Sequence, residues 1–434
     1  MVKKNTTGFI GLTHLGAVAS ISWASKFDRV IGFDLYEDLV NSFDSGVSAF
    51  KEPKMQDMLE EFKEKMEFTK DFRKLSQCNS VFITHDIVTD EKNRSQYKDF
   101  YALIDKAIPY LPQNIIIILM SQISVGMTRE LIKHIKEKRP KLRFDIIYYV
   151  DTLVIGIAFE RFLHPERIII GTEDGTEKVL DDYPFLKRQL NSFDAPVLIM
   201  KYESAEMTKI CINLYLFTSV MYANIVADLC EKYNADMIEI IPALRLDKRI
   251  GKYSYICPSL GVTGGHLERD MRTIERMQKE AKIDSDLIEK IIDFNDKRYR
   301  WVEDKLNSHL YPKFKNPKIC IFGLAYKKGT ASVKNSLAIK IINSLPDKIK
   351  FCAYDPYVKE LNVKKKIKLF DDPYKAVENS DCLIILTDHD EIKNIDIKKL
   401  KGKIKKGIIL DCFNIYSHDK QEFKDLNYIA VGRS

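Results

Sequence analysis

The alternation of hydrophobic and polar positions divides the chain into three stretches. From Gly8 to about Ile170, amphipathic segments of helical period alternate with the short apolar runs GFIGL, RVIGFD, SVFITHD, NIIIILM, FDIIYYV and ERIIIG. This alternation predicts a mostly parallel sheet with helices on both faces. From about Ser204 to Leu306 the apolar positions follow a helical period, and from Lys318 the strand pattern returns in KICIFGL, KFCAYD, CLIILTD and GIILDCF. We therefore expect an α/β protein with two doubly wound Rossmann-like domains joined by a central helical domain.

Length and composition agree with an ordinary globular protein. The chain has 434 residues, of which 45% are hydrophobic and 30% are charged, and it has no long low-complexity tract. At roughly 150 residues per domain, two or three domains are expected. The net charge of +7 comes from lysines spread through mixed-sign segments such as EEFKEKMEF. Such segments are typical of solvated helix faces, so we expect no nucleic-acid partner.

Cysteine spacing and the apolar runs indicate the cellular compartment of the protein. The eight cysteines form neither a CxxC pair nor a Cys/His metal spacing, which predicts reduced thiols in a cytoplasmic protein and no metal site. The first apolar run is broken by Thr13, His14 and Ser20, unlike a signal peptide. No stretch is predicted to be long and apolar enough to cross a bilayer, so we expect no membrane association.

The opening strand–helix–strand unit has the pattern of a dinucleotide fingerprint. The strand GFIGL leads into GLTHLG and a helix, and the strand RVIGFD ends at Asp34. Gly11 would permit the tight turn, Gly16 would permit close helix packing, and the helix N-terminus would bind the pyrophosphate. Asp34 would accept hydrogen bonds from the ribose hydroxyls and repel a 2′-phosphate, which favours NAD over NADP. Thr13 departs from the pattern at the second glycine, and a structural turn that binds no ligand is the alternative interpretation.

Several further segments resemble signatures of the UDP-glucose/GDP-mannose dehydrogenase family. They are SAEMTKICINLYLFTSVMYANIVADLCEKYNAD, LDKRIG, YICPSLGVTGGHLERD, HPERIIIG, IFGLAYKKGT, AYDP and LTDHDEIKNID. The resemblance extends over nearly the whole chain and implies an NAD-dependent oxidoreductase that acts on a nucleotide sugar in polysaccharide or capsule precursor synthesis. It implies an NAD-binding Rossmann domain at 1–200, a helical dimerisation domain at 201–306 and a nucleotide-sugar-binding α/β domain at 307–434. A homodimer or a higher homo-oligomer is expected.

The resemblance also implies roles for single residues. Lys209 and Asn213 lie four apart in the central helical segment, which places both on one helix face. Lys209 would stabilise negative charge on the reacting oxygen, while Asn213 and Asp270 would hold a water network that accepts the proton. Arg249 would reach into the sugar site of a neighbouring subunit. Without the resemblance, Lys209 and Arg249 would be interpreted as surface charges and Asp270 as a helix N-cap.

The residue at the position of the family's nucleophile is the main departure from the resemblance. The segment from Gly261 to Asp270 aligns without a gap and reads GVTGGHLERD, so His266 stands where the family has a cysteine that forms a thioester on the way to an acid. Imidazole can act as a general base but cannot supply that thioester. Cys257, nine residues earlier, is an alternative nucleophile, although an ordinary loop cysteine is the default interpretation.

Other departures affect the same chemistry. A serine–threonine pair of the family reads Ser121-Gln122 here. Asp151 stands for one of two family glutamates and Ile155 for the other, which leaves the water-activating carboxylate unassigned. Lys334 occupies an arginine position. Phe413 replaces another arginine, which removes a planar charge that could bind sugar or phosphate.

The expected site residues form three groups. They are Lys209, Asn213, His266, Asp270, Asp151 and Gln122 as catalytic residues, Gly11, Thr13, Gly16, Asp34, Thr84, Ser121, Arg269 and Lys334 at the cofactor, and Arg249, Tyr255, Gly261 and Lys328 at the substrate. The leading hypothesis is an oxidation at the sugar C6 hydroxyl that stops at the carbonyl. One alternative is a four-electron oxidation to a uronate without a thioester, through a hydrated aldehyde activated by His266. The other is a catalytically retired homologue that still binds nucleotide sugar or NAD.

Overall fold

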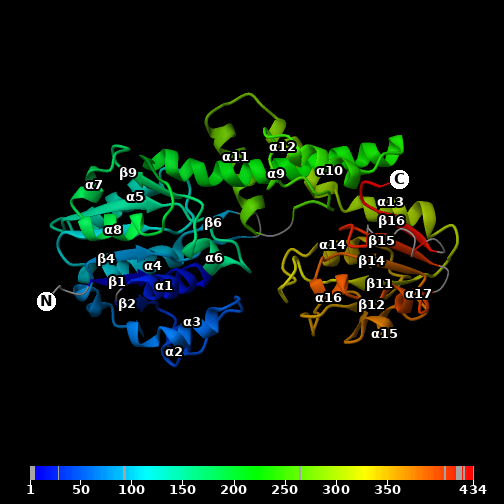
Figure 1. Cartoon of the computed structure of the whole chain (residues 1–434), viewed down its shortest axis with the longest axis horizontal. Coiled ribbons are helices and arrows are strands. Elements are labelled where there is room, and N and C mark those ends of the chain that lie inside the picture. The colour runs from blue at the N-terminus through cyan, green and yellow to red at the C-terminus, as the bar shows by residue number, and fades with distance from the viewer. Residues whose placement is uncertain are drawn as a thin grey trace. The chain divides into compact units, whose positions relative to one another are not determined.

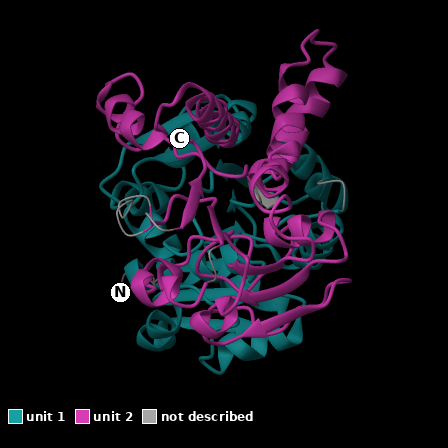
Figure 2. Ribbon diagram, turned by 90° about the vertical axis from the view of Figure 1, so that its right-hand side faces the viewer, with its two compact units in different colours: residues 1–212 teal, residues 213–434 magenta. Residues whose placement is uncertain are grey.

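The computed structural model describes residues 5–27, 29–90, 94–262, 265–404, 407–416, 423 and 426–433; for residues 265 and 266 only the backbone is described. The chain divides into two compact units, Met1–Ile212 and Asn213–Ser434, which Figure 2 colours separately. Each unit has its own sheet and its own hydrophobic cores.

The first unit is built on an eight-stranded sheet in the order β10-β9-β8-β7-β4-β1-β2-β3. Figure 1 labels its strands β9, β4, β1 and β2. Its pairs are parallel except for β8 with β9, which are antiparallel. The strands are β1 (Thr6–Ile10), β2 (Arg29–Phe33), β3 (Met66–Thr69), β4 (Ser80–Ile83), β7 (Ile115–Leu119), β8 (Phe144–Tyr149), β9 (Ile168–Thr172) and β10 (Val197–Lys201). A separate antiparallel pair joins β5 (Val88–Thr89) to β6 (Ser95–Gln96). All six predicted apolar runs form strands, whereas β3 and β10 were not predicted.

Alternate residues of each central strand enter two different cores. In β7, Ile116 and Ile118 belong to one core, while Ile117 and Leu119 belong to the other. Side chains of a strand alternate between its faces, so this sheet is covered on both sides, as its apolar strands predict. The first core is covered by α1 (His14–Lys26), α2 (Glu37–Asp44), α3 (Met55–Glu61), α6 (Ala158–Leu163), α7 (Lys178–Asp181) and α8 (Pro184–Asn191). The second is covered by α4 (Lys98–Ala107), α5 (Met127–Lys138) and the short 3-10 helices η2 (Phe72–Gln77) and η3 (Ile108–Tyr110).

The long helix α9 (Tyr202–Tyr233) begins in the first unit and continues in the second. In the second unit its residues Phe217 and Met221 pack with Met271 of α11 (Gly265–Glu280) and with α12 (Leu287–Lys297). Beyond these, α10 (Met237–Leu246) and α13 (Arg300–His309) complete the central helices. The predicted helical domain is therefore present.

By length and composition, α9 is also the one helix among the described residues that could cross a membrane, and 44% of its most apolar stretch is buried. The core helix of a soluble protein passes the same test. The prediction that no stretch reaches this length and hydropathy is wrong, because apolar residues lie around most of the helix, both buried, as Phe217, and exposed, as Leu229.

A six-stranded parallel sheet forms the rest of the second unit, in the order β13-β12-β11-β14-β15-β16. Its strands are β11 (Lys318–Phe322), β12 (Lys350–Tyr354), β13 (Ile367–Phe370), β14 (Cys382–Ile385), β15 (Ile408–Asp411) and β16 (Asn427–Ala430). One face packs on α13 and α14 (Leu337–Ser344), the other on α15 (Pro373–Val377), α16 (Asp390–Lys393) and α17 (Ile397–Lys401). The four predicted strands are present, and the expected fold class is confirmed.

Candidate functional site

Two glycines shape the first strand-to-helix turn. Gly11 has a φ of 95°, and a Cβ added there would lie 2.7 Å from the backbone of His85. A Cβ on Gly16 would lie 1.8 Å from the carbonyl oxygen of Gly11. The hydroxyl of Thr84 donates a hydrogen bond of 2.8 Å to that same carbonyl. Only glycine permits this approach between β1, the end of β4 and α1.

Asp34 lies at the end of β2 and is fully buried. Its Oδ2 accepts the N–H of Leu12 at 2.7 Å, and its Oδ1 accepts the N–H of Tyr36 at 3.1 Å. A carboxylate has about four lone-pair sites, so these two bonds leave acceptor capacity for further donors such as ribose hydroxyls.

His85 adds an observation that bears on a ligand. Burial lowers the pKa of His85, while the charges of Asp34 and Asp86 act in the opposite direction. Its Nδ1 is buried and has no hydrogen-bond partner among the described residues. A buried polar atom left in this way beside the glycine turn is explained by a partner such as a bound ligand or water. The glycine turn, the acceptor capacity of Asp34 and this atom together fit a dinucleotide.

The sheet order brings further predicted residues to the same edge. Because β7, β4 and β1 are neighbours, the residues that follow them lie side by side. The buried Ser121, after β7, donates its N–H to the carbonyl of Ile83 at 3.1 Å, and Gln122 is buried next to it in sequence. Gly11, Thr84 and Ser121 therefore lie at one edge of the first sheet. In other doubly wound domains, ligands bind at the edge formed by the carboxyl ends of the strands.

Lys209 contacts Asp151 within the first unit. Its Nζ donates a hydrogen bond of 2.6 Å to the carbonyl oxygen of Asp151 and lies 3.6 Å from the Oδ2 of the same residue. The Oδ1 of Asp151 accepts the N–H of Leu153 at 2.7 Å. Lys209 is buried. Both residues were predicted for the site separately, and the structure brings them together.

Asn213 and Asp270 form the corresponding pair in the second unit. The Nδ2 of Asn213 donates to the Oδ2 of Asp270 at 2.6 Å, and the Nε of Arg269 donates to its Oδ1 at 3.3 Å. All three side chains are buried. Because α11 begins at Gly265, Asp270 lies inside the helix, and its interpretation as an N-cap is wrong. The side chain of His266 lies outside the described residues.

The glycine-rich loop before α11 is held by two asparagines. The Oδ1 of Asn224 accepts the N–H of Ser259 at 2.7 Å, and the Oδ1 of Asn295 accepts the N–H of Val262 at 2.7 Å. Gly261 has a φ of 102°, and a Cβ there would lie 2.7 Å from the Oδ1 of Asn295. Sequence reasoning missed both asparagines, since each lies more than 30 residues from its loop partner.

Four predicted residues lie at the surface instead. Arg249 is 89% exposed in its side chain and bonds to Asp247 at 3.0 and 2.7 Å. Tyr255 and Lys334 are exposed, and Lys328 lies 4.0 Å from Asp390. In the part of the chain that the structure describes, these four do not join either buried pair.

The eight cysteines are free thiols. Six are buried, and the other two, Cys211 and Cys257, are exposed. Cys257 accepts a hydrogen bond of 3.3 Å from the Nη2 of Arg245.

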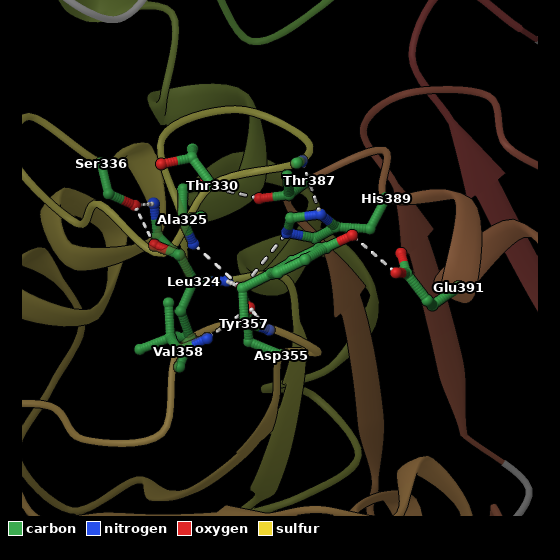
Figure 3. A network of polar contacts seen from close by, with 12 residues as sticks. Leu324, Ala325, Thr330, Ser336, Asp355, Tyr357, Val358, Thr387, His389 and Glu391 are labelled. Carbon is green, nitrogen blue, oxygen red and sulfur yellow. Dashed lines mark hydrogen bonds and ion pairs between the residues drawn. The ribbon is translucent and has the colours of Figure 1, made fainter. Parts of the chain in front are cut away.

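The second sheet repeats the arrangement of Gly11 and Asp34. Gly323 follows β11 with a φ of 89°, and Asp355 follows β12. The carboxylate of Asp355 accepts four backbone N–H groups at 2.6 to 3.1 Å, those of Leu324, Ala325, Tyr357 and Val358 (Figure 3). The motif AYDP contains Asp355, but the sequence analysis assigned it no role.

His389 covers this carboxylate. Its Nε2 lies 3.4 Å from the Oδ2 of Asp355, and its Nδ1 accepts the N–H of Gly329 at 3.2 Å (Figure 3). Burial alone would raise the pKa of Asp355, but His389 and the backbone N–H groups outweigh burial and lower that pKa to about 2. The turn after β11 thus surrounds a carboxylate that is held in its charged form.

Comparison with known proteins matches the regions that contain these two turns to nucleotide-binding domains. Three domain profiles of the UDP-glucose/GDP-mannose dehydrogenase family match: the NAD binding domain over residues 5–183, the central domain over 203–297 and the UDP binding domain over 320–418. The UDP-glucose 6-dehydrogenase of Rickettsia bellii is 28% identical over 432 residues, which cover 98% of this chain and 98% of the relative. The UDP-glucose 6-dehydrogenase TuaD of Bacillus subtilis is 27% identical over 435 residues, with coverage of 98% and 92%.

A solved structure agrees in fold. The UDP-glucose dehydrogenase of Pyrobaculum islandicum superposes with a TM-score of 0.88 at 20% identity, over 100% of this chain and 98% of that one. The matched first domain identifies NAD as the cofactor, and a UDP binding domain is present. The chain therefore belongs to the UDP-glucose/GDP-mannose dehydrogenase family of NAD-dependent nucleotide-sugar dehydrogenases.

Proposed function

We propose that this protein oxidises the C6 hydroxyl of a nucleotide sugar to a carbonyl and releases the product at that stage, in the synthesis of polysaccharide precursors in the cytoplasm. The observation that carries the proposal is the buried hydrogen bond of 2.6 Å between Asn213 and Asp270. It supports a working first oxidation. The absence of a cysteine at His266 supports the arrest after that step.

The first oxidation needs a proton acceptor and stabilisation of the charge that develops on oxygen. Bound NAD supplies the hydride acceptor. Asp270 accepts the hydroxyl proton through water, while Asn213 and Arg269 fix the orientation of its carboxylate. The ammonium group of Lys209, held by the carbonyl of Asp151 at 2.6 Å, stabilises the developing negative charge.

A second oxidation would need a nucleophile or an activated water at the carbonyl. The residue aligned with the nucleophile is His266, and imidazole forms no thioester. Asp151, which stands at the position of one of the family's two glutamates, accepts the N–H of Leu153 and lies 3.6 Å from the charge of Lys209. The acceptor capacity of this carboxylate is therefore already partly used within the chain. Both features favour release of the carbonyl over further oxidation to a uronate.

We propose one nucleotide site at each of the two sheets. Gly11, Gly16 and Asp34 would hold NAD together with the first turn of α1. The turn after Gly323, closed by Asp355, would hold the nucleotide of the sugar substrate, in the region that matches the UDP binding domain. Neither site identifies the sugar.

We further propose that an exposed apolar stripe of α9 contacts a second copy of the chain. The stripe consists of residues spaced three, four or seven apart on the helix, which places them on one face. Their exposed fractions are 60% for Tyr215, 47% for Tyr222, 50% for Ile225, 51% for Leu229 and 79% for Tyr233. Exposed apolar residues gathered on one helix face in this way are typical of an interaction surface. In the family, this helix lies in the domain that we expect to dimerise.

The stoichiometry of the reaction tests the proposal. The purified protein is incubated with NAD and, in turn, UDP-, GDP-, CDP- and dTDP-sugars, and NADH is measured by absorbance while the sugar product is identified by mass spectrometry. We expect one NADH per sugar and a carbonyl product. Two NADH per sugar with a uronate would replace the proposal with the four-electron alternative. No NADH with any sugar, despite measurable NAD binding, would support a retired homologue.

Two lysines on α9 provide a test variant and its control. Lys209→Ala removes the buried ammonium, and we expect NADH formation to fall at least a hundredfold. Lys232→Ala removes an exposed lysine from the last turn of the same helix and should leave the rate unchanged. Equal rates in both variants would show that Lys209 has no role in the reaction.

A further inference from the structure

The N-terminus of α1 binds a carboxylate of the chain itself. The first N–H groups of a helix have no partner within the helix. Thr13 stands at the N-cap position, but its side chain makes no capping hydrogen bond, and the first turn of α1 contains no acidic residue. Instead, the Oδ2 of Asp86 accepts the N–H of Leu15 at 3.2 Å. Asp86 comes three residues after β4, so it reaches α1 from the neighbouring strand.

Thr13 fixes Asp86 in this position. Its Oγ1 accepts the N–H of Asp86 at 2.8 Å and lies 3.4 Å from the carbonyl oxygen of Thr84. A glycine at this position could make neither contact. The threonine that departs from the dinucleotide fingerprint is therefore the residue that attaches the loop after β4 to the start of α1.

The same N–H groups and the positive end of the helix dipole are what a dinucleotide pyrophosphate uses in domains of this class. A carboxylate and a pyrophosphate are both negative, so they repel each other strongly over a few ångströms in a partly buried site. His85 interacts electrostatically with both Asp34 and Asp86 but provides no compensating charge, because burial lowers its pKa. Asp34 adds a further negative charge nearby.

We propose that Asp86 competes with the pyrophosphate of NAD for the N-terminus of α1, and that binding of the cofactor displaces the Asp86 carboxylate from Leu15. The affinity for NAD is thereby lowered by a residue of the chain itself. Thr13 sets the strength of this competition, because it holds the backbone of Asp86 in place. This inference rests on the family's use of NAD and is independent of which sugar is oxidised or how far.

Isothermal titration calorimetry with NAD tests the competition without any turnover. Asp86→Asn keeps an oxygen that can accept the N–H of Leu15 but removes the charge, and we expect its NAD affinity to rise roughly tenfold. Glu61→Gln removes an exposed charge from α3 in the same unit and should leave the affinity unchanged. Adenosine has no pyrophosphate, so its binding, followed by NMR line broadening, should be equal in wild type and Asp86→Asn.

A second variant tests the same idea without changing any charge. Thr13→Val removes the hydroxyl that holds Asp86 and keeps a similar side-chain shape, so NAD affinity should rise in the same direction. The gain in the double variant should be smaller than the product of the two single gains, because both act on one contact. An unchanged or weakened NAD affinity in Asp86→Asn and Thr13→Val, with folding verified by thermal denaturation, would show that Asp86 is only a helix cap and would overturn the proposal. A gain for adenosine equal to that for NAD would overturn it too.

Discussion

The side-chain amide of Asn213 donates a hydrogen bond of 2.6 Å to the carboxylate of Asp270, and both side chains are buried. Asn213 belongs to α9 and Asp270 to α11, so the bond joins two helices of the second unit. A buried carboxylate is costly unless donors satisfy it, and Arg269 supplies a second donor at 3.3 Å. These donors fix the orientation of the carboxylate. A group that must receive a proton from one direction needs such a fixed orientation.

Asp270→Asn should therefore lower the rate of NADH formation by roughly 10²–10⁴, the usual contribution of a positioned proton acceptor. The amide keeps the shape of the side chain but cannot accept a proton. NAD affinity, measured by calorimetry, should stay close to that of the wild type. Asp284→Asn, at an exposed position of the same unit, is the control. A turnover number equal to that of the wild type would exclude Asp270 from proton transfer.

His266→Cys should permit some acid product. The spacing from Gly261 to Asp270 aligns without a gap, so the substituted cysteine would stand at the family's nucleophile position. His266→Ala should still form the carbonyl at a measurable rate, because Lys209 and Asp270, which act in the first oxidation, are unchanged. Mass spectrometry distinguishes the products. If the wild type already makes a uronate and His266→Ala abolishes only the acid, His266 activates water and the single-oxidation proposal is wrong.

Asp34→Ala should weaken NAD binding by roughly 1–3 kcal/mol, because the ribose hydroxyls lose a charged acceptor. Since Asp34 also accepts the N–H of Leu12 at 2.7 Å, thermal denaturation must first verify that the domain is folded. The milder Asp34→Asn keeps an oxygen acceptor and should raise the affinity for NADP relative to NAD. Calorimetry with both nucleotides measures this. An unchanged ratio would mean that Asp34 does not face the 2′ position.

Leu229→Glu should shift the protein from dimer to monomer. Leu229 is 51% exposed within the apolar stripe of α9, and a carboxylate there would be buried without a partner in the proposed contact between copies. Lys348→Glu, at an exposed position of the same unit outside α9, is the control. Multi-angle light scattering at micromolar concentration gives the mass of each variant. A wild type that is already monomeric under these conditions would contradict the proposed contact.

The sequence predicted the strands because their apolar runs are long enough to be distinctive. IIIIL of β7 is buried throughout and could hardly be anything else in a doubly wound domain. The unpredicted β3 and β13 read MEFT and IKLF, where polar residues interrupt the apolar ones within only four positions. Such short runs form strands because a neighbouring strand offers its edge, and a local pattern cannot reveal that neighbour.

Residue types at the site were predictable, but their contacts were not. Thr13 was recognised as a departure from the fingerprint, yet its partner Asp86 lies 73 residues further along the chain. Lys209 and Asp151 are 58 residues apart. These pairs depend on the order of strands in the sheet, which periodicity does not encode. The carboxylate of Asp355 was missed for the same reason, since its donors come from the turns after two different strands.

Asp355 makes the stability of the second unit dependent on pH. Its folded-state pKa of about 2 lies below the ordinary value of 3.8. A carboxyl whose pKa is lowered by folding stabilises the folded state above its unfolded pKa, and this contribution is lost as the pH falls through the folded value. The shift corresponds to about 2 kcal/mol at neutral pH. Asp355→Asn should lose this stabilisation at pH 7, and its difference from the wild type should shrink between about pH 4 and pH 2.

The two tryptophans of the chain allow this unit to be followed separately. Trp301 packs in the core under the second sheet and Trp23 in the first unit, so Trp23→Phe leaves one fluorescent reporter of the second unit. Urea unfolding of this background, with and without Asp355→Asn, gives the difference in unfolding free energy at each pH. Asp371→Asn serves as the control, because Asp371 is 89% exposed and pairs only at the surface with Lys359. A difference that is the same at pH 7 and pH 2 would show that Asp355 acts through hydrogen bonding alone and not through its charge.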